Sequence, residues 1–258
     1  MFRLTHIALH LGRGVAIAAF IFPFLGASHR ADHIRRWSAH LLRALKVDLE
    51  VEGTPPPAGE AILLVANHVS WLDPFVINAV RPMRFVAKSE VARWPVIGWL
   101  AARAGTLYVI RSQRHHTAQI NQQVVKAMQG GEAFAVFPEG TTTNGSVVLP
   151  FHASLLQPAF ESGAPLVPVA LCYLRADGSP CTEAAYDGDK SVLDTLRAMM
   201  TLSLIRVQLK FLTQIPCIDY SNRRELARAA ERAIASALNL SAPRTRTETT
   251  PGLRAVMR

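Results

Sequence analysis

Beyond about residue 60 the chain alternates short apolar runs with longer stretches whose apolar residues recur at helical spacing. Short runs bounded by turn residues predict buried strands, and the spaced stretches predict amphipathic helices. The predicted strands are AILLVAN (61–67), RFVAK (84–88), TLYVIR (106–111), AFAVF (133–137), LVPVALCY (166–173) and IRVQLKFL (205–212). The predicted helices cover residues 70–80, 90–103 and 115–129, the segment SLLQPAFESG and a final stretch that ends near Leu238. This alternation predicts an α/β fold, a single domain with a largely parallel central sheet flanked by helices.

The first fifty residues follow a different pattern, an apolar stretch and then a basic amphipathic one. Leu4 to Ala27 is almost uncharged, and its uninterrupted part, GVAIAAFIFPFLGA, is shorter than the roughly 20 residues that cross a bilayer upright. It can span a membrane if Arg13 reaches the interface, or it can lie in one leaflet. The following SHRADHIRRWSAHLLRALK gathers its apolar residues at helical spacing among arginines, which is typical of a helix at an anionic membrane surface.

Two other interpretations fit the same N-terminal pattern. A signal peptide also has a basic start and an apolar core, but no convincing small-residue cleavage site precedes the basic helix. The amphipathic helix can also pack on the protein core, as most such helices do. Residues 1–46 hold seven Lys or Arg and one acid, Asp32, and this imbalance favours the membrane.

Three consecutive prolines in VEGTPPPAGE (51–60) predict a stiff connector after the basic helix. We divide the chain there into membrane-associated helices over residues 1–50 and a globular domain over residues 51–240. The tail over residues 241–258 is rich in Thr, Arg and Pro and is expected to be disordered.

Composition narrows the function. The net charge of +9 on 258 residues predicts an anionic partner, such as nucleic acid, a phospholipid surface or a phosphorylated substrate. Three widely spaced cysteines without CxxC spacing indicate neither a disulfide framework nor a zinc site, and fit a cytosol-facing environment. Nucleotide-binding loops, an H-E-x-x-H motif and nucleic-acid-binding signatures are missing from the sequence. We therefore expect no metal, no cofactor and no nucleic-acid partner.

NHVSWLDP, residues 67–74, follows the first apolar run of the globular part and places His68 five positions before Asp73. On a regular helix the two side chains would lie roughly 140° apart, so they can meet only if His68 precedes the helix. Ser70 and Asp73 form a Ser-x-x-Asp pattern that predicts a helix start near Ser70. Asp73 is therefore either a helix cap or the partner of His68, and taken alone the pattern slightly favours the cap.

Three further stretches lie where predicted strands end, the usual place for sites in α/β sheets. Arg111 ends one strand, and FPEGTTTNG places Glu139, Gly140 and three threonines at the end of another. The proline of LVPVALCY predicts an edge strand or a bulge beside a cleft. Taken singly, FPEGTTTNG is equally well a plain loop with an Asn-Gly turn, and Arg111 a solvated charge.

Together, in this order and spacing, the stretches resemble the four sequence blocks of the glycerolipid acyltransferases, the family of 1-acylglycerol-3-phosphate acyltransferase. NHVSWLDP resembles the family's His-x4-Asp block, and VAKSEVARWPVIGWLAARAGTLYVIR its second block with the lead-in. FPEGTTTNG resembles the third block and LVPVALCY the fourth. The resemblance covers roughly residues 60 to 175 and reverses the balance at Asp73, in favour of a working pair with His68.

The resemblance implies a membrane-bound O-acyltransferase that moves a fatty acyl group from a thioester to a lysolipid hydroxyl. His68 would act as general base and Asp73 would fix its tautomer. The donor would be acyl-CoA or acyl carrier protein, and no cofactor is implied. Location at the cytoplasmic face of the inner (plasma) membrane is expected, with membrane lipids as partners. The residues that the resemblance assigns to substrate binding are Lys88, Arg111, Glu139, Gly140, Thr141 and Thr142.

One departure from the family bears on the acceptor. Many members that acylate lysophosphatidic acid have arginine after Glu-Gly-Thr, where this chain has Thr142. Arginine makes a charged bidentate contact to phosphate, whereas threonine offers one neutral hydroxyl. The acceptor implied first is 1-acyl-sn-glycerol-3-phosphate, giving phosphatidic acid, and the alternative is another lysolipid such as lyso-ornithine lipid or a lysophospholipid with a head group.

Two function classes remain as alternatives. A serine or cysteine hydrolase of acyl esters lacks support, because the chain has no G-x-S-x-G elbow. A non-catalytic basic lipid-binding protein would explain the charge but not the paired His68 and Asp73.

Overall fold

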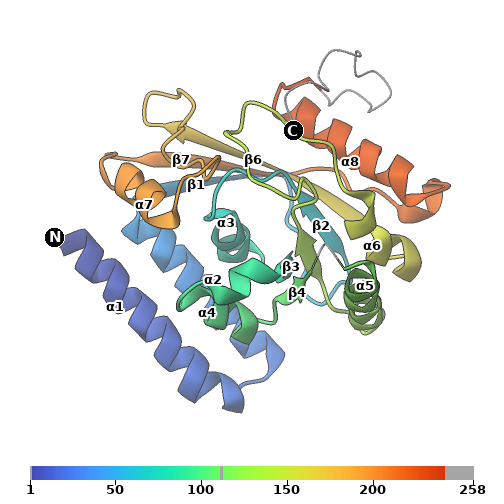
Figure 1. Cartoon of the computed structure of the whole chain (residues 1–258), viewed down its shortest axis with the longest axis horizontal. Coiled ribbons are helices and arrows are strands. Elements are labelled where there is room, and N and C mark those ends of the chain that lie inside the picture. The colour runs from blue at the N-terminus through green and yellow to red at the C-terminus, as the bar shows by residue number, and fades with distance from the viewer. Residues whose placement is uncertain (1, 111–112, 242–258) are drawn as a thin grey trace.

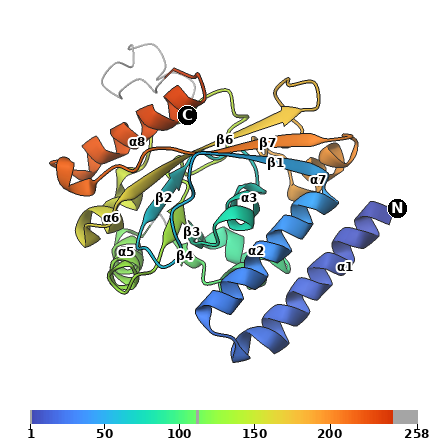
Figure 2. The ribbon, with the colours of Figure 1, turned by 180° about the vertical axis from the view of Figure 1, so that it is seen from behind.

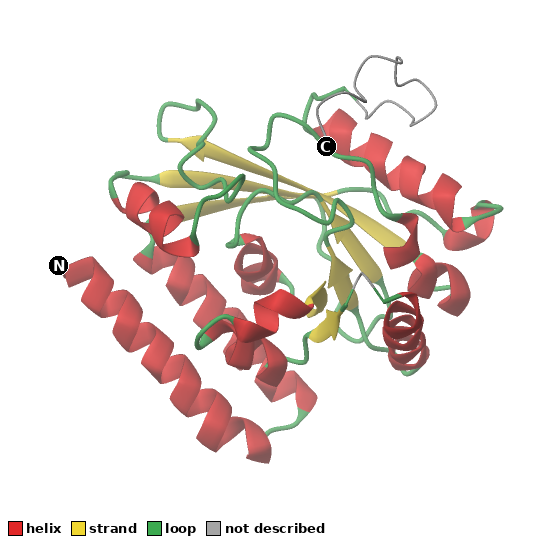
Figure 3. Cartoon of the chain, in the orientation of Figure 1, coloured by secondary structure: helices red, strands yellow, loops and turns green. Residues whose placement is uncertain are grey.

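The computed structural model describes residues 2–110 and 113–241. Within these residues the strands form one seven-stranded sheet in the order β1-β7-β6-β2-β5-β3-β4 (Figures 1 and 3). The strands are β1 (Val47–Glu52), β2 (Leu63–Ala66), β3 (Arg84–Lys88), β4 (Leu107–Val109), β5 (Phe134–Val136), β6 (Leu166–Arg175) and β7 (Ile205–Phe211). Neighbouring strands run parallel except β6 and β7, which are antiparallel. The prediction of an α/β fold with a largely parallel sheet is confirmed.

Helices cover both faces of the sheet. The helices are α1 (Phe2–Ala16), α2 (Ala27–Ala44), α3 (Asp73–Val80), α4 (Ile97–Arg103), α5 (Arg114–Gln129), α6 (Gln157–Ser162), α7 (Val192–Met200) and α8 (Arg223–Ala237). Shorter helical turns are η1 (Ile17–Ile21), η2 (Phe22–Phe24), η3 (Ser89–Arg93), η4 (Ala153–Leu155) and η5 (Cys217–Asp219). One face packs on α2, α3 and α7, and the other on α5, α6 and α8 (Figure 1). In β2, Leu64 packs in the core on the α2, α3 and α7 face, and Leu63 packs in the core on the opposite face. Because β2 is buried on both faces, its sequence is an unbroken apolar run.

Two elements were not predicted from the sequence. Strand β1 alternates apolar and acidic residues at the edge of the sheet, and its acids pair with bases on β7: Glu50 with Arg206 (2.9 Å) and Glu52 with Lys210 (3.2 Å). Helix α7 begins with a capping box in which the Ser191 side chain accepts from the Asp194 N–H.

The helix predicted over residues 90–103 is instead two short pieces, η3 and α4. Pro95 lies between them, and proline has no N–H to donate and disfavours helical backbone in the residue before it. Val96 follows at φ +63°, and the Ile97 N–H donates to the Pro95 carbonyl (2.6 Å). This is the geometry of a tight three-residue turn, which is strained for a β-branched residue.

Of the two structures predicted at Pro168, an edge strand or a bulge, the edge strand is wrong, because β6 is a central strand between β7 and β2. The ladder between β6 and β7 begins only at Val169, which pairs with Phe211. Beyond that pair the Pro168 carbonyl accepts from the Leu212 N–H (3.0 Å). The proline therefore sits where the ladder to β7 ends, so its missing N–H removes at most one terminal bond.

The N-terminal helices form a hairpin, and α2 lies between α1 and the rest of the molecule (Figure 2). The pair is locked by a reciprocal contact: the Trp37 Nε1–H donates to the His10 carbonyl (3.1 Å), and His10 Nε2 lies 3.0 Å from the Trp37 carbonyl. The apolar face of α2 packs on the core through Leu41 and Leu42, as in the alternative that the sequence left open. The stretch Arg3–Phe24, 22 residues, is by length and composition the one described helix able to cross a membrane.

Candidate active site

The site lies at the carboxyl ends of adjacent parallel strands. His68 follows β2 and Glu139 follows β5, and these two strands are neighbours in the sheet. Strand β6 runs parallel to β2 but continues past its end, where the buried Asn67 side chain bonds both the N–H (2.8 Å) and the carbonyl (3.0 Å) of Leu171. The extended β6 thereby brings Tyr173 beside the loop that carries His68.

His68 and Asp73 form a direct pair. The distance between His68 Nδ1 and Asp73 Oδ2 is 2.7 Å, and the Asp73 side chain is fully buried. A carboxylate accepts only, so Nδ1 carries the hydrogen and Nε2 is left to accept a proton. The imidazole stacks on Phe137, with ring centroids 4.1 Å apart, and this contact fixes the plane of the ring.

Asp73 lies in the first turn of α3, but its carboxylate orders the preceding loop and does not cap the helix, since the cap position, Leu72, makes no side-chain capping bond. Asp73 Oδ2 accepts from the N–H groups of Val69 (2.8 Å) and Ser70 (3.0 Å), while α3 begins at Asp73 itself, three residues later than predicted from Ser70. The hydroxyl of Tyr173 donates to Oδ1 (2.6 Å). A buried carboxylate requires this many donors, because each replaces a lost water.

Glu139 is buried beneath the site and bonds two backbone segments. Its Oε1 accepts from the His68 N–H (2.8 Å), and its Oε2 accepts from the Leu149 N–H (2.9 Å). Burial raises the pKa of Glu139 to about 7, against the effect of these two bonds. The structure therefore places Glu139 as the brace between the His68 loop and the loop after β5.

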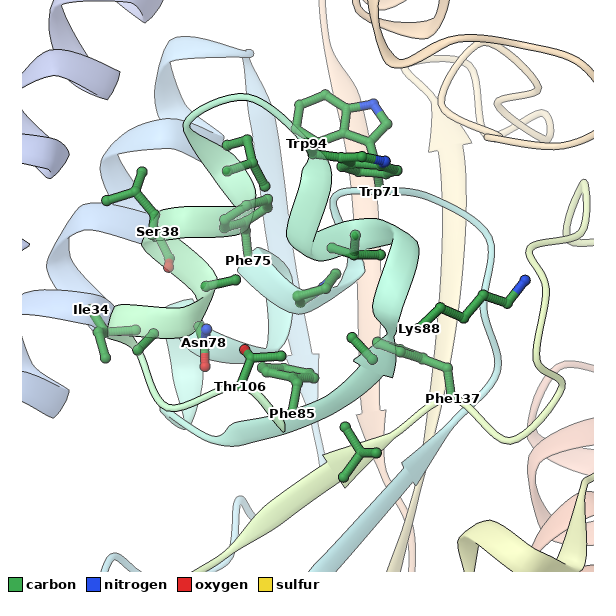
Figure 4. Close-up of a pocket in the computed structure, with 18 of the residues that line it drawn as sticks. Ile34, Ser38, Trp71, Phe75, Asn78, Phe85, Lys88, Trp94, Thr106 and Phe137 are labelled. Atoms are coloured by element: carbon green, nitrogen blue, oxygen red, sulfur yellow. The ribbon is translucent and has the colours of Figure 1, made fainter. Parts of the chain in front are cut away.

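A cavity of about 510 Å³ extends from His68 toward the N-terminal hairpin (Figure 4). Its far walls are mostly apolar side chains from six elements, and Lys88 extends away from them at the end of β3 (Figure 4). Apolar wall residues include Ile17, Ala18, Phe22, Ile34, Trp37, Trp71, Phe75, Phe85, Ile97 and Leu100. Near His68 the wall consists of Phe137, Gly140, Thr141, Thr142 and Tyr186.

The predicted substrate-binding residues divide into three groups. Gly140, Thr141, Thr142 and Lys88 line the cavity together with His68, whereas Glu139 is not among the lining residues. Arg111 lies outside the residues that the structure describes. The Thr142 hydroxyl donates to the carbonyl of Tyr186, a contact with no signal in the sequence.

Comparison with known proteins assigns the family. The family model described as Acyltransferase matches residues 48–172. The lyso-ornithine lipid O-acyltransferase of Pseudomonas aeruginosa is 39% identical over 213 residues, which are 83% of this chain and 81% of that protein. The chain belongs to the acyltransferase family. This acyltransferase is also 34% identical to the 1-acyl-sn-glycerol-3-phosphate acyltransferase of Neisseria meningitidis over 194 residues, 75% of this chain and 76% of that protein.

The acyltransferase has the fold of a solved relative. The crystal structure of the 1-acyl-sn-glycerophosphate (LPA) acyltransferase from Thermotoga maritima superimposes with a TM-score of 0.69 at 20% identity, covering 92% of this chain and 95% of that one. The structural overlap covers 92% of this chain and therefore reaches into the N-terminal hairpin. The family model, in contrast, begins only at residue 48.

Proposed function

We propose that this acyltransferase transfers a fatty acyl group from an acyl thioester to the free hydroxyl of a lysolipid, with His68 as general base. The observation that carries the proposal is the buried Asp73 carboxylate 2.7 Å from His68 Nδ1, at the end of an apolar cavity. The names of the similar proteins, which act on lyso-ornithine lipid and on 1-acyl-sn-glycerol-3-phosphate, support the same reaction class.

The proposed chemistry needs no acyl-enzyme. His68 Nε2 accepts the proton of the lysolipid hydroxyl as its oxygen attacks the thioester carbonyl carbon. The carbon–sulfur bond of the tetrahedral intermediate then breaks, and the thiolate leaves with the proton from His68. Asp73 keeps the ring in the Nδ1–H tautomer and stabilises the imidazolium between the two transfers.

The loop after β5 supplies donors for the oxyanion. The Gly140 N–H donates to the Phe137 carbonyl (3.2 Å), whereas the N–H groups of Thr141 and Thr142 have no partner among the described residues. Backbone donors aimed at a developing oxyanion lower the barrier because they are already oriented. The proposal assigns the tetrahedral oxygen to this side of His68, and the acyl chain to the apolar walls beyond Phe137.

Two acceptors fit, and an observation favours each. Lys88 at the cavity and the net charge of +9 favour the anionic 1-acyl-sn-glycerol-3-phosphate, whose acylation gives phosphatidic acid. The 39% identity to a lyso-ornithine lipid O-acyltransferase favours lyso-ornithine lipid, and Thr142 brings no charge to a phosphate. The donor, acyl-CoA or acyl carrier protein, and a position at the cytoplasmic face of the inner membrane complete the proposal.

The test is transfer of a labelled acyl group by the full-length protein in vesicles, from acyl-CoA and from acyl carrier protein, to each lysolipid in parallel. We expect His68→Ala to lower turnover by about 100-fold or more, the usual scale of general-base loss. His115→Ala, on the exposed part of α5, is the matched control and should retain full activity. Free fatty acid released without an acceptor would instead indicate a hydrolase, and normal transfer by His68→Ala would exclude the proposed base.

A further inference from the structure

The segment between β6 and α7 crosses over the reaction site. Within it, residues 184–188, here called the strap, connect the two loops that carry the chemistry. The Tyr186 N–H donates to the carbonyl of Val69 (2.9 Å), in the His68 loop. On the other side of the same residue, the Tyr186 carbonyl accepts from the hydroxyl of Thr142, in the loop after β5. Tyr186 thus bonds both loops through its backbone alone.

The strap is anchored on each side of Tyr186. Ala184 and Ala185 are fully buried in the core, so the chain before Tyr186 cannot shift without opening the core. After it, Lys190 pairs with Asp187 (2.6 Å) and also approaches the carbonyl of Ala185 (3.4 Å). The backbone of Tyr186 is therefore anchored on both sides.

The Tyr186 side chain lies on the cavity wall. Its ring meets the Trp94 ring edge-on, with centroids 5.9 Å apart and an interplanar angle of 84°. Trp94 comes from the segment between η3 and α4, far from the strap in sequence. Such an edge-to-face contact between aromatic rings is attractive as well as space-filling. Both rings line the cavity, and Tyr186 lies beside Thr142, whose hydroxyl bonds its carbonyl.

The cavity separates the two parts of a lysolipid reaction by polarity. Its N-terminal end is largely apolar, with the neutral polar side chains of Ser38, Asn78 and Thr106 among the apolar ones (Figure 4). It suits an acyl chain better than a charged head group, which would lose most of its hydration there. The ammonium of Lys88 extends away from this end, and the hydroxyls of Thr141 and Tyr186 belong to the strap side of the cavity. The head group is therefore placed on the side of the strap.

We propose that the strap selects the acceptor, with Tyr186 as the residue that limits the size of the head group and Thr142 as its positioning residue. This rests on the proposed function, acyl transfer to a lysolipid. It also explains the threonine at position 142: its hydroxyl tethers the strap, so it acts through Tyr186 and does not contact the head group. The strap lies beyond the family match, which ends at residue 172, so relatives can differ here while sharing the catalytic blocks.

The experiment compares kcat/KM for three acceptors with one acyl donor: 1-acyl-sn-glycerol-3-phosphate, 1-acyl-sn-glycero-3-phosphoethanolamine and lyso-ornithine lipid. Tyr186→Ala removes the ring and should raise use of the two larger acceptors relative to the first by about tenfold or more. Thr142→Val keeps the shape and removes the tether, so it should shift the ratio in the same direction by a smaller factor and leave the donor KM unchanged. Tyr186→Phe keeps the ring and should preserve the ratio.

Thr201→Val is the matched control, because the Thr201 hydroxyl also donates to a backbone carbonyl, that of Ala198 (2.7 Å), away from the cavity. A melting curve checks folding, and Tyr186→Leu replaces the alanine variant if that unfolds. Active variants with unchanged acceptor ratios, or a rise confined to the donor KM, would overturn the role of the strap and leave the proposed function intact. A wild-type protein that transfers to none of the three acceptors would overturn both.

Discussion

At the scale of single residues, the buried Asp73 carboxylate organises the site. It accepts from two backbone N–H groups, from the Tyr173 hydroxyl and from His68 Nδ1. The backbone bonds fix where the carboxylate lies, and the Tyr173 bond shares its charge. Burial together with this hydroxyl bond to Asp73 raises the pKa of Tyr173 well above its usual value, so the phenol remains a donor at every working pH.

We predict that Tyr173→Phe lowers kcat by about tenfold, the scale of one hydrogen bond to a charged group. Without this donor the Asp73 charge is less shared and holds the proton on His68 more tightly. The acidic limb of the pH–rate profile should therefore move to higher pH, a change that a purely structural defect would not produce. Tyr220→Phe serves as the control, and an unshifted profile in an active Tyr173→Phe protein would assign Tyr173 to packing alone.

The pair of His68 and Asp73 could be predicted from the sequence, but only through the resemblance to the acyltransferase blocks, because the local pattern alone slightly favoured a helix cap. Tyr173 and Tyr186 could not, because their contacts depend on how far β6 extends past β2 and where the following segment crosses. Tyr173 is the last residue of LVPVALCY, but its distance from Asp73 depends on the register of β6 against β2, which the sequence alone does not give.

At the scale of elements, α1 and the turns after it expose large apolar side chains. Phe20 is 75% exposed and Phe24 is 86% exposed, at the end of the hairpin far from the core. Isolated exposed apolar residues are common, but several on one helical end indicate a surface that another apolar phase covers. The cavity begins beside this end, since Ile17 and Phe22 line it.

We predict that Phe20→Ser together with Phe24→Ser weakens binding to vesicles by about tenfold or more, because each phenylalanine buried in lipid contributes roughly 1.5–3 kcal/mol. The fold should persist, since neither side chain is buried. Co-sedimentation with vesicles measures the change, and Ile218→Ser, which alters a side chain that is 91% exposed in η5, is the control. Equal sedimentation of the double variant and the wild type would place the membrane contact elsewhere.

Strands and helices could be predicted from the sequence where their residues are completely buried. They could not be predicted where burial is partial. Strands β2 and β5 are apolar throughout and could be predicted from their runs. Strand β1 alternates apolar and acidic residues, the period of a half-buried strand, but it has only six residues and directly follows the basic helix, so the sequence prediction divided it between the helical segment and the connector. Helix α4 is shorter than predicted because Pro95 interrupts a pattern whose apolar spacing continues through it.

At the scale of the whole molecule, Glu139 makes stability depend on pH. Its pKa is raised from 4.5 to about 7 by burial, so between these values the folded chain holds a proton that the unfolded chain releases. Its contribution to folding is fully present below pH 4.5 and is lost as pH rises through about 7. The shift corresponds to about 3 kcal/mol.

We predict that the free energy of unfolding of the wild type falls between pH 5 and pH 7.5, and that Glu139→Gln removes most of this slope. The glutamine amide still accepts one backbone N–H but cannot lose a proton. The free energy of unfolding of Glu139→Gln should therefore be lower overall and should vary less with pH. Urea titrations at matched pH values measure both proteins. An equal slope in the two proteins would show that other groups, such as the buried Glu231, set the dependence.

The pairing of β1 with β7 has a consequence for how the chain is made. Glu50 of β1 and Gln208 of β7 bond across 158 residues of sequence. A ribosome completes the N-terminal hairpin and β1 long before β7 leaves it, and early segments begin to associate during synthesis. Strand β1 can pair only after β7, its only neighbour in the described sheet, has been synthesised. By then the apolar N-terminal hairpin is already outside the ribosome and can contact lipid. The last strand therefore completes the sheet only after the N-terminal hairpin has left the ribosome.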